Sequence, residues 1–169
     1  MNEGPISSII ERPETIAIIG VDGTTKLLVL DVDGTIWHND YRPDRQPPFV
    51  RLNATEVRTG DGETISIKQG MIGLLSQARD MNVTCSIASI GDPDIVLPII
   101  QQFKLPTRFI HPQLGWDGKD VMIGEILRRF EAEDGISISD AEITFLDDEE
   151  KNLIEVGNRF PAARLVKVP

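Results

Sequence analysis

The sequence predicts an α/β fold in which helices cover both faces of a central parallel sheet. From Lys26 onward, short apolar runs alternate with amphipathic stretches, as expected where each strand is followed by a helix. The apolar runs are nearly continuous, which is typical of strands buried on both faces. With 169 residues, 40% of them hydrophobic, the chain is long enough to form one domain, residues 1–169, around a sizeable core.

The local pattern places these elements in order. Strands are predicted at 26–31, 82–88, 108–111, 142–147 and 164–168, and helices at 69–80, 92–104, 118–133 and 149–160. Asp92 is a suitable cap for the helix that it begins, and Pro93 suits its first turn. Pro98 lies inside the same helix and is expected to kink it.

Two segments do not follow the alternation. Residues 38–70 carry no helix pattern, and alternating residues around Gly60-Asp61-Gly62 predict a β-hairpin insertion there. Residues 1–25 are interpreted as an N-terminal arm, in which 16–19 form either a short edge strand or part of an irregular docked segment. We interpret the insertion's arginines as solvated, with substrate contact as the alternative: Arg42, Arg45, Arg51 and Arg58.

The charge balance excludes several classes of function. The chain has 17 Lys and Arg residues against 27 Asp and Glu residues, a net charge of −10. Such a chain lacks the basic face that binds a nucleic-acid backbone or an anionic membrane. The longest apolar run, 95–100, contains Pro98, and no signal peptide is recognisable, so we expect a cytoplasmic protein with no membrane span. The single Cys85 excludes an internal disulfide and a multi-thiolate metal site.

Two aspartates stand where a parallel sheet usually binds its ligand. Asp31 and Asp33 follow the apolar run 27–30, and ligands of open α/β sheets bind at the carboxyl ends of the strands. Gly34 permits a tight turn there, which can direct both carboxylates toward one site.

The segment from Asp31 to Thr35 resembles the first motif, Asp-x-Asp-Gly-Thr, of the haloacid dehalogenase (HAD) superfamily. The resemblance implies that Asp31 is a nucleophile that becomes an aspartyl phosphate. It also implies that Asp33 protonates the leaving oxygen and then activates water. A Mg²⁺ ion is implied at the Asp31 carboxylate and the Asp33 backbone carbonyl.

The remaining superfamily motifs occur in the expected order. Ser89, after the second predicted strand, matches the residue that donates a hydrogen bond to the phosphoryl group, and Lys119 matches the lysine that neutralises it. Asp147 and Asp148 match the acidic pair that completes the metal site. The resemblance further implies a three-layer, Rossmann-like (HAD-like) domain, with the Asp31 strand between those that end at Ser89 and Asp147.

Further residues resemble the small magnesium-dependent acid phosphatases of that superfamily. These are Trp37 after the first motif, the hairpin in place of a large cap, Asp117-Gly118-Lys119, and 147–152 with its terminal Asn152. Ser89, Lys119, Trp37, Gly34 and Asn152 are the substrate-binding residues so implied, although Asn152 is equally explained as a helix-surface residue. The implied substrates are phosphosugars, small phosphometabolites and phosphotyrosine. One departure is that Ile90-Gly91-Asp92 follows Ser89, where the family commonly has Arg-Thr.

These motifs predict a Mg²⁺-dependent phosphatase with an open site, which a homo-oligomer partner could cover. Two alternatives are a non-catalytic or carrier-binding HAD-like domain, and a phosphoacceptor signalling domain. The second alternative requires a separate acceptor aspartate on a later strand, whereas the second core strand here ends at Ser89.

Overall fold

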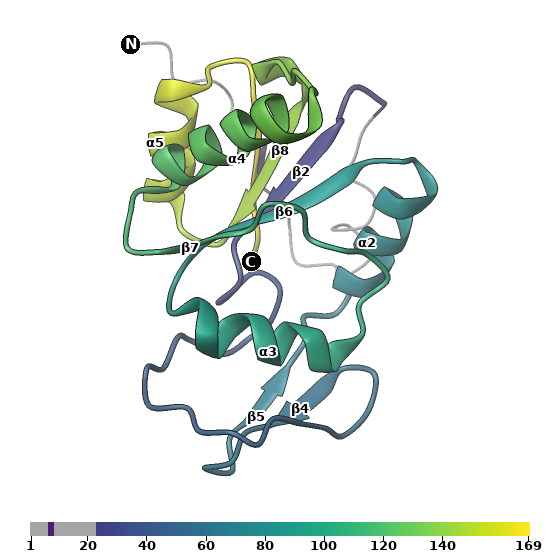
Figure 1. The fold of residues 1–169 in the computed structure, drawn as a ribbon, viewed down its shortest axis with the longest axis vertical. Coiled ribbons are helices and arrows are strands. Elements are labelled where there is room, and N and C mark those ends of the chain that lie inside the picture. Colours follow the sequence, from purple (N-terminus) through teal and green to yellow (C-terminus); the bar gives the residue numbers. More distant parts are fainter. Residues whose placement is uncertain (1–6, 9–22) are drawn as a thin grey trace.

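The fold is built on a six-stranded sheet whose strands all pair in parallel (Figure 1). The structure is a computed structural model that describes residues 7–8 and 23–169. The strands are β1 (Ser7–Ser8), β2 (Leu27–Leu30), β6 (Thr84–Ile90), β7 (Gln113–Gly115), β8 (Ile143–Asp147) and β9 (Arg164–Lys167). Their order, β1-β9-β8-β2-β6-β7, places β2 between β8 and β6, which confirms the predicted arrangement.

Within the described residues, four α-helices cover the sheet, two on each face. Figure 1 shows α4 (Lys119–Asp134) and α5 (Glu150–Arg159) on one side of β2, with α2 (Met71–Asp80) and α3 (Pro93–Phe103) on the other. A short 3-10 helix, Asp140–Glu142, leads into β8. The predicted α/β, three-layer, Rossmann-like fold is therefore confirmed.

The alternation of side chains along β2 explains why both faces need helices. Leu28 and Leu30 belong to the core formed with α2 and α3, whereas Leu27 and Val29 belong to the core formed with α4 and α5. All of these leucine and valine side chains are fully buried. Burying large apolar side chains stabilises a fold by roughly 1.5–3 kcal/mol each, so this short strand anchors both layers.

The insertion forms a second, antiparallel sheet with the order β3-β4-β5. Its strands are β3 (Val50–Arg51), β4 (Glu56–Arg58) and β5 (Thr64–Ser66). Val57 and Ile65 lie opposite each other in this sheet, and both side chains are fully buried in the core that includes α3. The predicted hairpin is confirmed, and β3 adds a strand to it.

One predicted strand is wrong. Residues 108–111 do not form a strand, and β7 lies further along the chain at Gln113–Gly115. Phe109 makes only an isolated bridge to Cys85, and His111 has a left-handed backbone with φ of 51°. A residue with positive φ interrupts an extended chain, so regular pairing with β6 begins only after it.

Helix α3 has the predicted N-cap, because the Asp92 carboxylate accepts a hydrogen bond from the Asp94 backbone N–H at 2.8 Å. Pro98 lies within this helix. Residues 16–19, interpreted above as an edge strand or an irregular arm, lie outside the described residues. Among residues 7–8 and 23–169, no helix has the length and apolarity needed to cross a membrane.

Candidate active site

The first motif forms a tight turn directly after β2. The Asp31 N–H donates to the Leu146 carbonyl at 3.0 Å, which continues the pairing of β2 with β8. The chain then turns back, since the N–H groups of Thr35 and Ile36 both donate to the carbonyl of Val32. Gly34 sits in this turn at φ of 73°, a conformation that glycine adopts without strain.

Lys119 connects the ends of the central strands. It is the first residue of α4, and its Nζ donates to Asp31 Oδ1 at 2.6 Å and to the Ala88 carbonyl at 2.7 Å. The same Nζ lies 3.4 Å from Asp147 Oδ2. A lysine at a helix N-terminus opposes the helix dipole, and a buried ammonium needs paired charges. The two carboxylates therefore explain how a lysine that is only 2% exposed is tolerated there.

The acidic pair after β8 lies beside this cluster. Asp147, the last residue of β8, is fully buried, and its Oδ1 accepts a hydrogen bond from the Glu149 N–H at 2.8 Å. Its Oδ2 accepts one from Asn152 Nδ2 at 3.0 Å. Asn152 is therefore a contact of the site that fixes the orientation of Asp147.

Three carboxylates meet closely enough to share a metal ion. Asp31, Asp147 and Asp148 each offer an oxygen, and these atoms lie within 4.8 Å of one another. Asp33 is outside this group, so its predicted contribution to the metal site rests on the backbone carbonyl. A side chain at Gly34 would collide with this cluster, because a Cβ there would lie 2.3 Å from Asp148 Oδ2.

Burial dominates the electrostatics of both aspartates of the first motif. It raises the pKa of Asp31, and the opposing effect of Lys119 only partly offsets the loss of solvation. Burial also raises the pKa of Asp33, against the hydrogen bond from Trp37, whose Nε1 donates to Asp33 Oδ1 at 2.8 Å. The raised pKa of Asp33 suits a group that begins a reaction by donating a proton, which is the role implied for it above.

A cavity of about 370 Å³ opens over these groups. Its lining comprises Asp31, Asp33, Asp40, Tyr41, Ile90, Lys119, Asp148, Glu149, Lys151 and Asn152. Five of the predicted site residues thus share one cavity: Asp31, Asp33, Lys119, Asp148 and Asn152.

Ser89 and Trp37 are placed differently from those five. Ser89 lies in β6 with a fully buried side chain, and its Oγ donates to the Ile90 carbonyl at 3.4 Å. Ile90, not Ser89, lines the cavity. Trp37 is fully buried, so its contact with the site is made through Asp33.

The sequence interpretation missed several residues around the cavity. Asp40 and Tyr41 of the insertion both line the cavity. Tyr41 is held there by its hydroxyl, which accepts a hydrogen bond from the Asp92 N–H at 3.2 Å. Lys68 is half-buried at the end of the insertion, where burial lowers its pKa while Asp148 and Asp31 oppose that shift. Lys68 is therefore a further cation near the carboxylates, whereas the residue after Ser89 is the apolar Ile90. No sequence pattern marks Lys68, since its position depends on how the insertion folds back.

A carboxylate at the end of the central strand, beside a buried lysine and an acidic cluster, is the arrangement expected of a phosphatase of the HAD superfamily. The fold is also similar to a solved structure, the N-terminal part of the protein BF1531 from Bacteroides fragilis, described as containing a phosphatase domain complexed with Mg. The TM-score is 0.61 at 18% identity, and the match covers 93% of this chain and 39% of that chain. At this identity the similarity concerns the fold. Residues 24–160 match the Acid Phosphatase family, and the chain belongs to it.

Proposed function

We propose that this phosphatase is a Mg²⁺-dependent phosphomonoesterase that acts through an aspartyl phosphate on Asp31. The observation that carries the proposal is the position of the Asp31 carboxylate. It lies 2.6 Å from the Lys119 ammonium, within reach of two further carboxylates, and in the same cavity as Asp33. A nucleophile, a countercharge and a proton donor are thereby available around one small space.

In the first half of the reaction, an Asp31 oxygen attacks phosphorus and the bond from phosphorus to the leaving oxygen breaks. The proton of the Asp33 carboxyl passes to that oxygen, so the alcohol leaves neutral. In the second half, the Asp33 carboxylate takes a proton from a water molecule that attacks phosphorus. Phosphate is released, the Asp31 carboxylate is restored, and Asp33 is protonated again.

The residues present fit a magnesium ion. Mg²⁺ prefers oxygen ligands and usually keeps several waters, so the carboxylates of Asp31, Asp147 and Asp148 form a suitable donor set. When bound, Mg²⁺ supplies positive charge that reduces the repulsion between a carboxylate and the phosphate oxygens. Lys119 adds a fixed positive charge beside Asp31 Oδ1, and Asn152 holds Asp147 in place through Oδ2.

The cavity supports a small phosphomonoester as substrate, of the phosphosugar, phosphometabolite or phosphotyrosine type. Its wall combines charged groups with Tyr41 and Ile90. Next to Tyr41 lies Trp116, whose ring centroid is 5.7 Å away and which is 70% exposed. These side chains favour a substrate whose organic part has an apolar face.

Removal of divalent metal tests the proposal. Treatment with EDTA is expected to lower the hydrolysis of p-nitrophenyl phosphate by about 10²-fold or more, and added Mg²⁺ is expected to restore it. Ca²⁺ should restore little, because it prefers longer bonds and more ligands than this cluster offers. Full activity in a sample whose metal content is below detection by mass spectrometry would contradict the proposal.

A paired glycine experiment tests the role of Asp148 in the metal site. Gly34→Ala and Gly62→Ala both place alanine at positive φ, 73° and 93°, but at Gly62 a Cβ meets nothing within 4 Å. Both variants should lose about 1 kcal/mol of stability from backbone strain. Only Gly34→Ala displaces Asp148, and we expect it to raise the Mg²⁺ concentration for half-maximal activity about 10-fold. Equal Mg²⁺ requirements in the two variants would show that Asp148 is not a ligand.

A further inference from the structure

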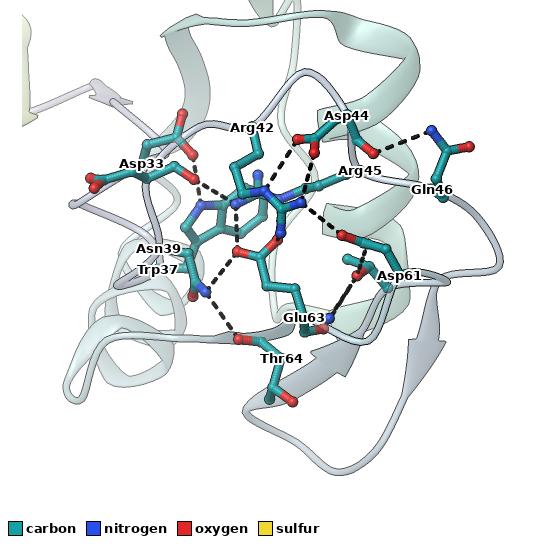
Figure 2. Close-up of polar contacts among 12 residues, drawn as sticks. Asp33, Trp37, Asn39, Arg42, Asp44, Arg45, Gln46, Asp61, Glu63 and Thr64 are labelled. Carbon is teal, nitrogen blue, oxygen red and sulfur yellow. Dashed lines mark hydrogen bonds and ion pairs between the residues drawn. The ribbon is translucent and has the colours of Figure 1, made fainter.

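The insertion carries a buried arginine that the proposed reaction does not use. The side chain of Arg45 is 0% exposed, although the chain around it is rich in proline and polar residues. Its Nε and Nη2 donate to the two Glu63 carboxylate oxygens at 2.8 and 3.1 Å, and Nη2 also donates to the Asp40 carbonyl. Figure 2 shows this guanidinium between Trp37 and Glu63. The arginine thus ties the hairpin to the segment that follows the first motif.

The Arg45–Glu63 pair does not account for the whole guanidinium. Within the described part of the chain, Nη1 is buried without a hydrogen-bond partner. Leaving such a donor buried and unsatisfied is unfavourable, because it loses its hydrogen bonds to water without replacement. A buried group retained at that cost calls for an explanation beyond the stability of the ion pair.

The contact of Arg45 that reaches the site is with Trp37. The guanidinium carbon lies 5.9 Å from the centre of the Trp37 ring, and the Phe103 ring lies 6.2 Å from the same indole. These neighbours hold a fully buried ring in one orientation. A cation near the ring also strengthens the indole N–H as a donor.

The indole in turn fixes the carboxyl of Asp33. Trp37 Nε1 donates to Asp33 Oδ1 at 2.8 Å (Figure 2). In a neutral carboxyl the carbonyl oxygen is a stronger acceptor than the hydroxyl oxygen, so this hydrogen bond favours Oδ1 as the carbonyl oxygen. The proton of a neutral Asp33 is therefore placed on Oδ2, and the plane of the carboxyl is set by the indole.

We propose that Arg45 is a positioning residue, which orients the proton donor Asp33 through the indole of Trp37. The proposal rests on the function proposed above, since it requires Asp33 to protonate the leaving oxygen. Arg45 acts at a distance and does not contact the substrate. The hairpin insertion, through its Glu63, thereby contributes to the chemical step as well as to the wall of the cavity.

The dependence of kcat/KM on the acidity of the leaving group distinguishes a positioning role of Arg45 from a purely structural one. A leaving group as acidic as 2,4-dinitrophenol departs without help, whereas phenol needs a proton from the enzyme. The value to measure is kcat/KM, because it covers the steps up to the departure of the alcohol. Misorientation of Asp33 lowers kcat/KM for phenyl phosphate selectively, whereas a general loss of structure lowers it for both esters.

Three variants make the comparison. Trp37→Phe keeps an aromatic ring but removes the N–H, and Arg45→Met combined with Glu63→Gln removes both charges, so that no carboxylate remains unpaired. We expect each to lose about 10²-fold on phenyl phosphate and less than about 3-fold on 2,4-dinitrophenyl phosphate. Arg42→Gln is the matched control, because Arg42 also contacts Glu63, at 3.3 Å, but is 40% exposed and makes no cation–π contact with the indole among the described residues. The kcat/KM values of Arg42→Gln for the two esters should equal those of the wild type.

Equal losses on both esters in the Arg45 variant, or no loss, would overturn the positioning role. If the double variant does not fold, Arg45→Lys decides the question, because it keeps a positive charge for Glu63 but not the flat guanidinium beside the indole. A selective loss on phenyl phosphate supports the proposal, and a wild-type ratio of the two esters contradicts it. Failure of the proposed function is recognised separately, by wild-type hydrolysis that does not depend on Mg²⁺ or by hydrolysis that persists in Asp31→Asn.

Discussion

The Asp31→Asn variant is expected to lower kcat/KM for p-nitrophenyl phosphate by about 10⁴-fold or more, because an amide oxygen does not replace a carboxylate as nucleophile. The substitution hardly changes the shape of the side chain. Its oxygen can still accept the hydrogen bond from Lys119, which is 2.6 Å from Asp31 Oδ1 in the wild type. The predicted loss is therefore chemical and does not depend on a rearranged site.

The stability of the Asp31→Asn variant should be close to that of the wild type. Burial and the Asp147 charge already oppose ionisation of Asp31, as its raised pKa shows, so a neutral side chain relieves a repulsion. Lys119 keeps Asp147 at 3.4 Å as a charged partner. Asp80→Asn is a matched control at the end of α2, where the side chain is 68% exposed. It should change neither the activity nor the unfolding midpoint.

A labelling experiment identifies the intermediate directly. Wild-type protein quenched in acid after mixing with a ³²P-labelled aryl phosphate should retain label that hydroxylamine releases, as expected of an acyl phosphate. With labelled 2,4-dinitrophenyl phosphate, whose leaving group needs no proton, Asp33→Asn should accumulate more label, because it lacks the carboxylate that activates water, and Asp31→Asn should retain none. If Asp31→Asn hydrolysed the substrate at the wild-type rate, or if it retained label, the proposed aspartyl phosphate on Asp31 would be contradicted.

The strands that end at the site could be predicted because burial on both faces leaves a simple signal. β2 is a continuous apolar run and β6 and β8 are mostly apolar, and Asp31 and Asp147 stand at the ends of two of these strands. Parallel pairing then brings the carboxyl ends together, without any information about side-chain contacts. Lys119 was instead implied by the resemblance to the superfamily motif, and it lies at the start of α4.

The role of Arg45 could not be predicted in this way. We interpreted it as solvated, but its side chain is fully buried against a glutamate that lies 18 residues later. The sequence around a single charged residue in an irregular segment does not indicate its ion-pair partner, because that pairing depends on how two loops pack. The strand β7 was misplaced for a related reason, since nothing in the sequence marks the left-handed backbone of His111.

The Lys119→Met variant is expected to lose about 10³-fold in kcat/KM, and it should also lose about 3 kcal/mol of stability in metal-free buffer. Methionine fills a similar volume, but the ammonium that faces Asp31 and Asp147 is gone. Removing one partner of a buried charge cluster leaves carboxylates that are neither solvated nor paired. Both losses therefore have the same electrostatic origin.

The same argument gives the variant a distinctive dependence on pH and metal. Without Lys119, the pKa values of Asp31 and Asp147 in the fold rise further above the ordinary 3.8. The folded state then holds protons that the unfolded chain has released, so metal-free stability falls as pH rises from about 4 toward those raised values. The stability deficit should shrink in excess Mg²⁺, because the ion replaces part of the missing positive charge and binds only the folded protein.

Lys26→Met provides the control for this electrostatic explanation. Lys26 pairs with Glu142 at 2.5 Å near the opposite end of β2, but its side chain is 66% exposed. An exposed pair contributes about 0–1 kcal/mol, so denaturant unfolding of this variant should be near that of the wild type, with unchanged activity. If Lys119→Met were as stable as Lys26→Met in metal-free buffer at pH 8, the carboxylates would not be ionised together in the folded protein. The electrostatic role assigned to Lys119 would then be wrong, because there would be no buried negative charge for its ammonium to neutralise.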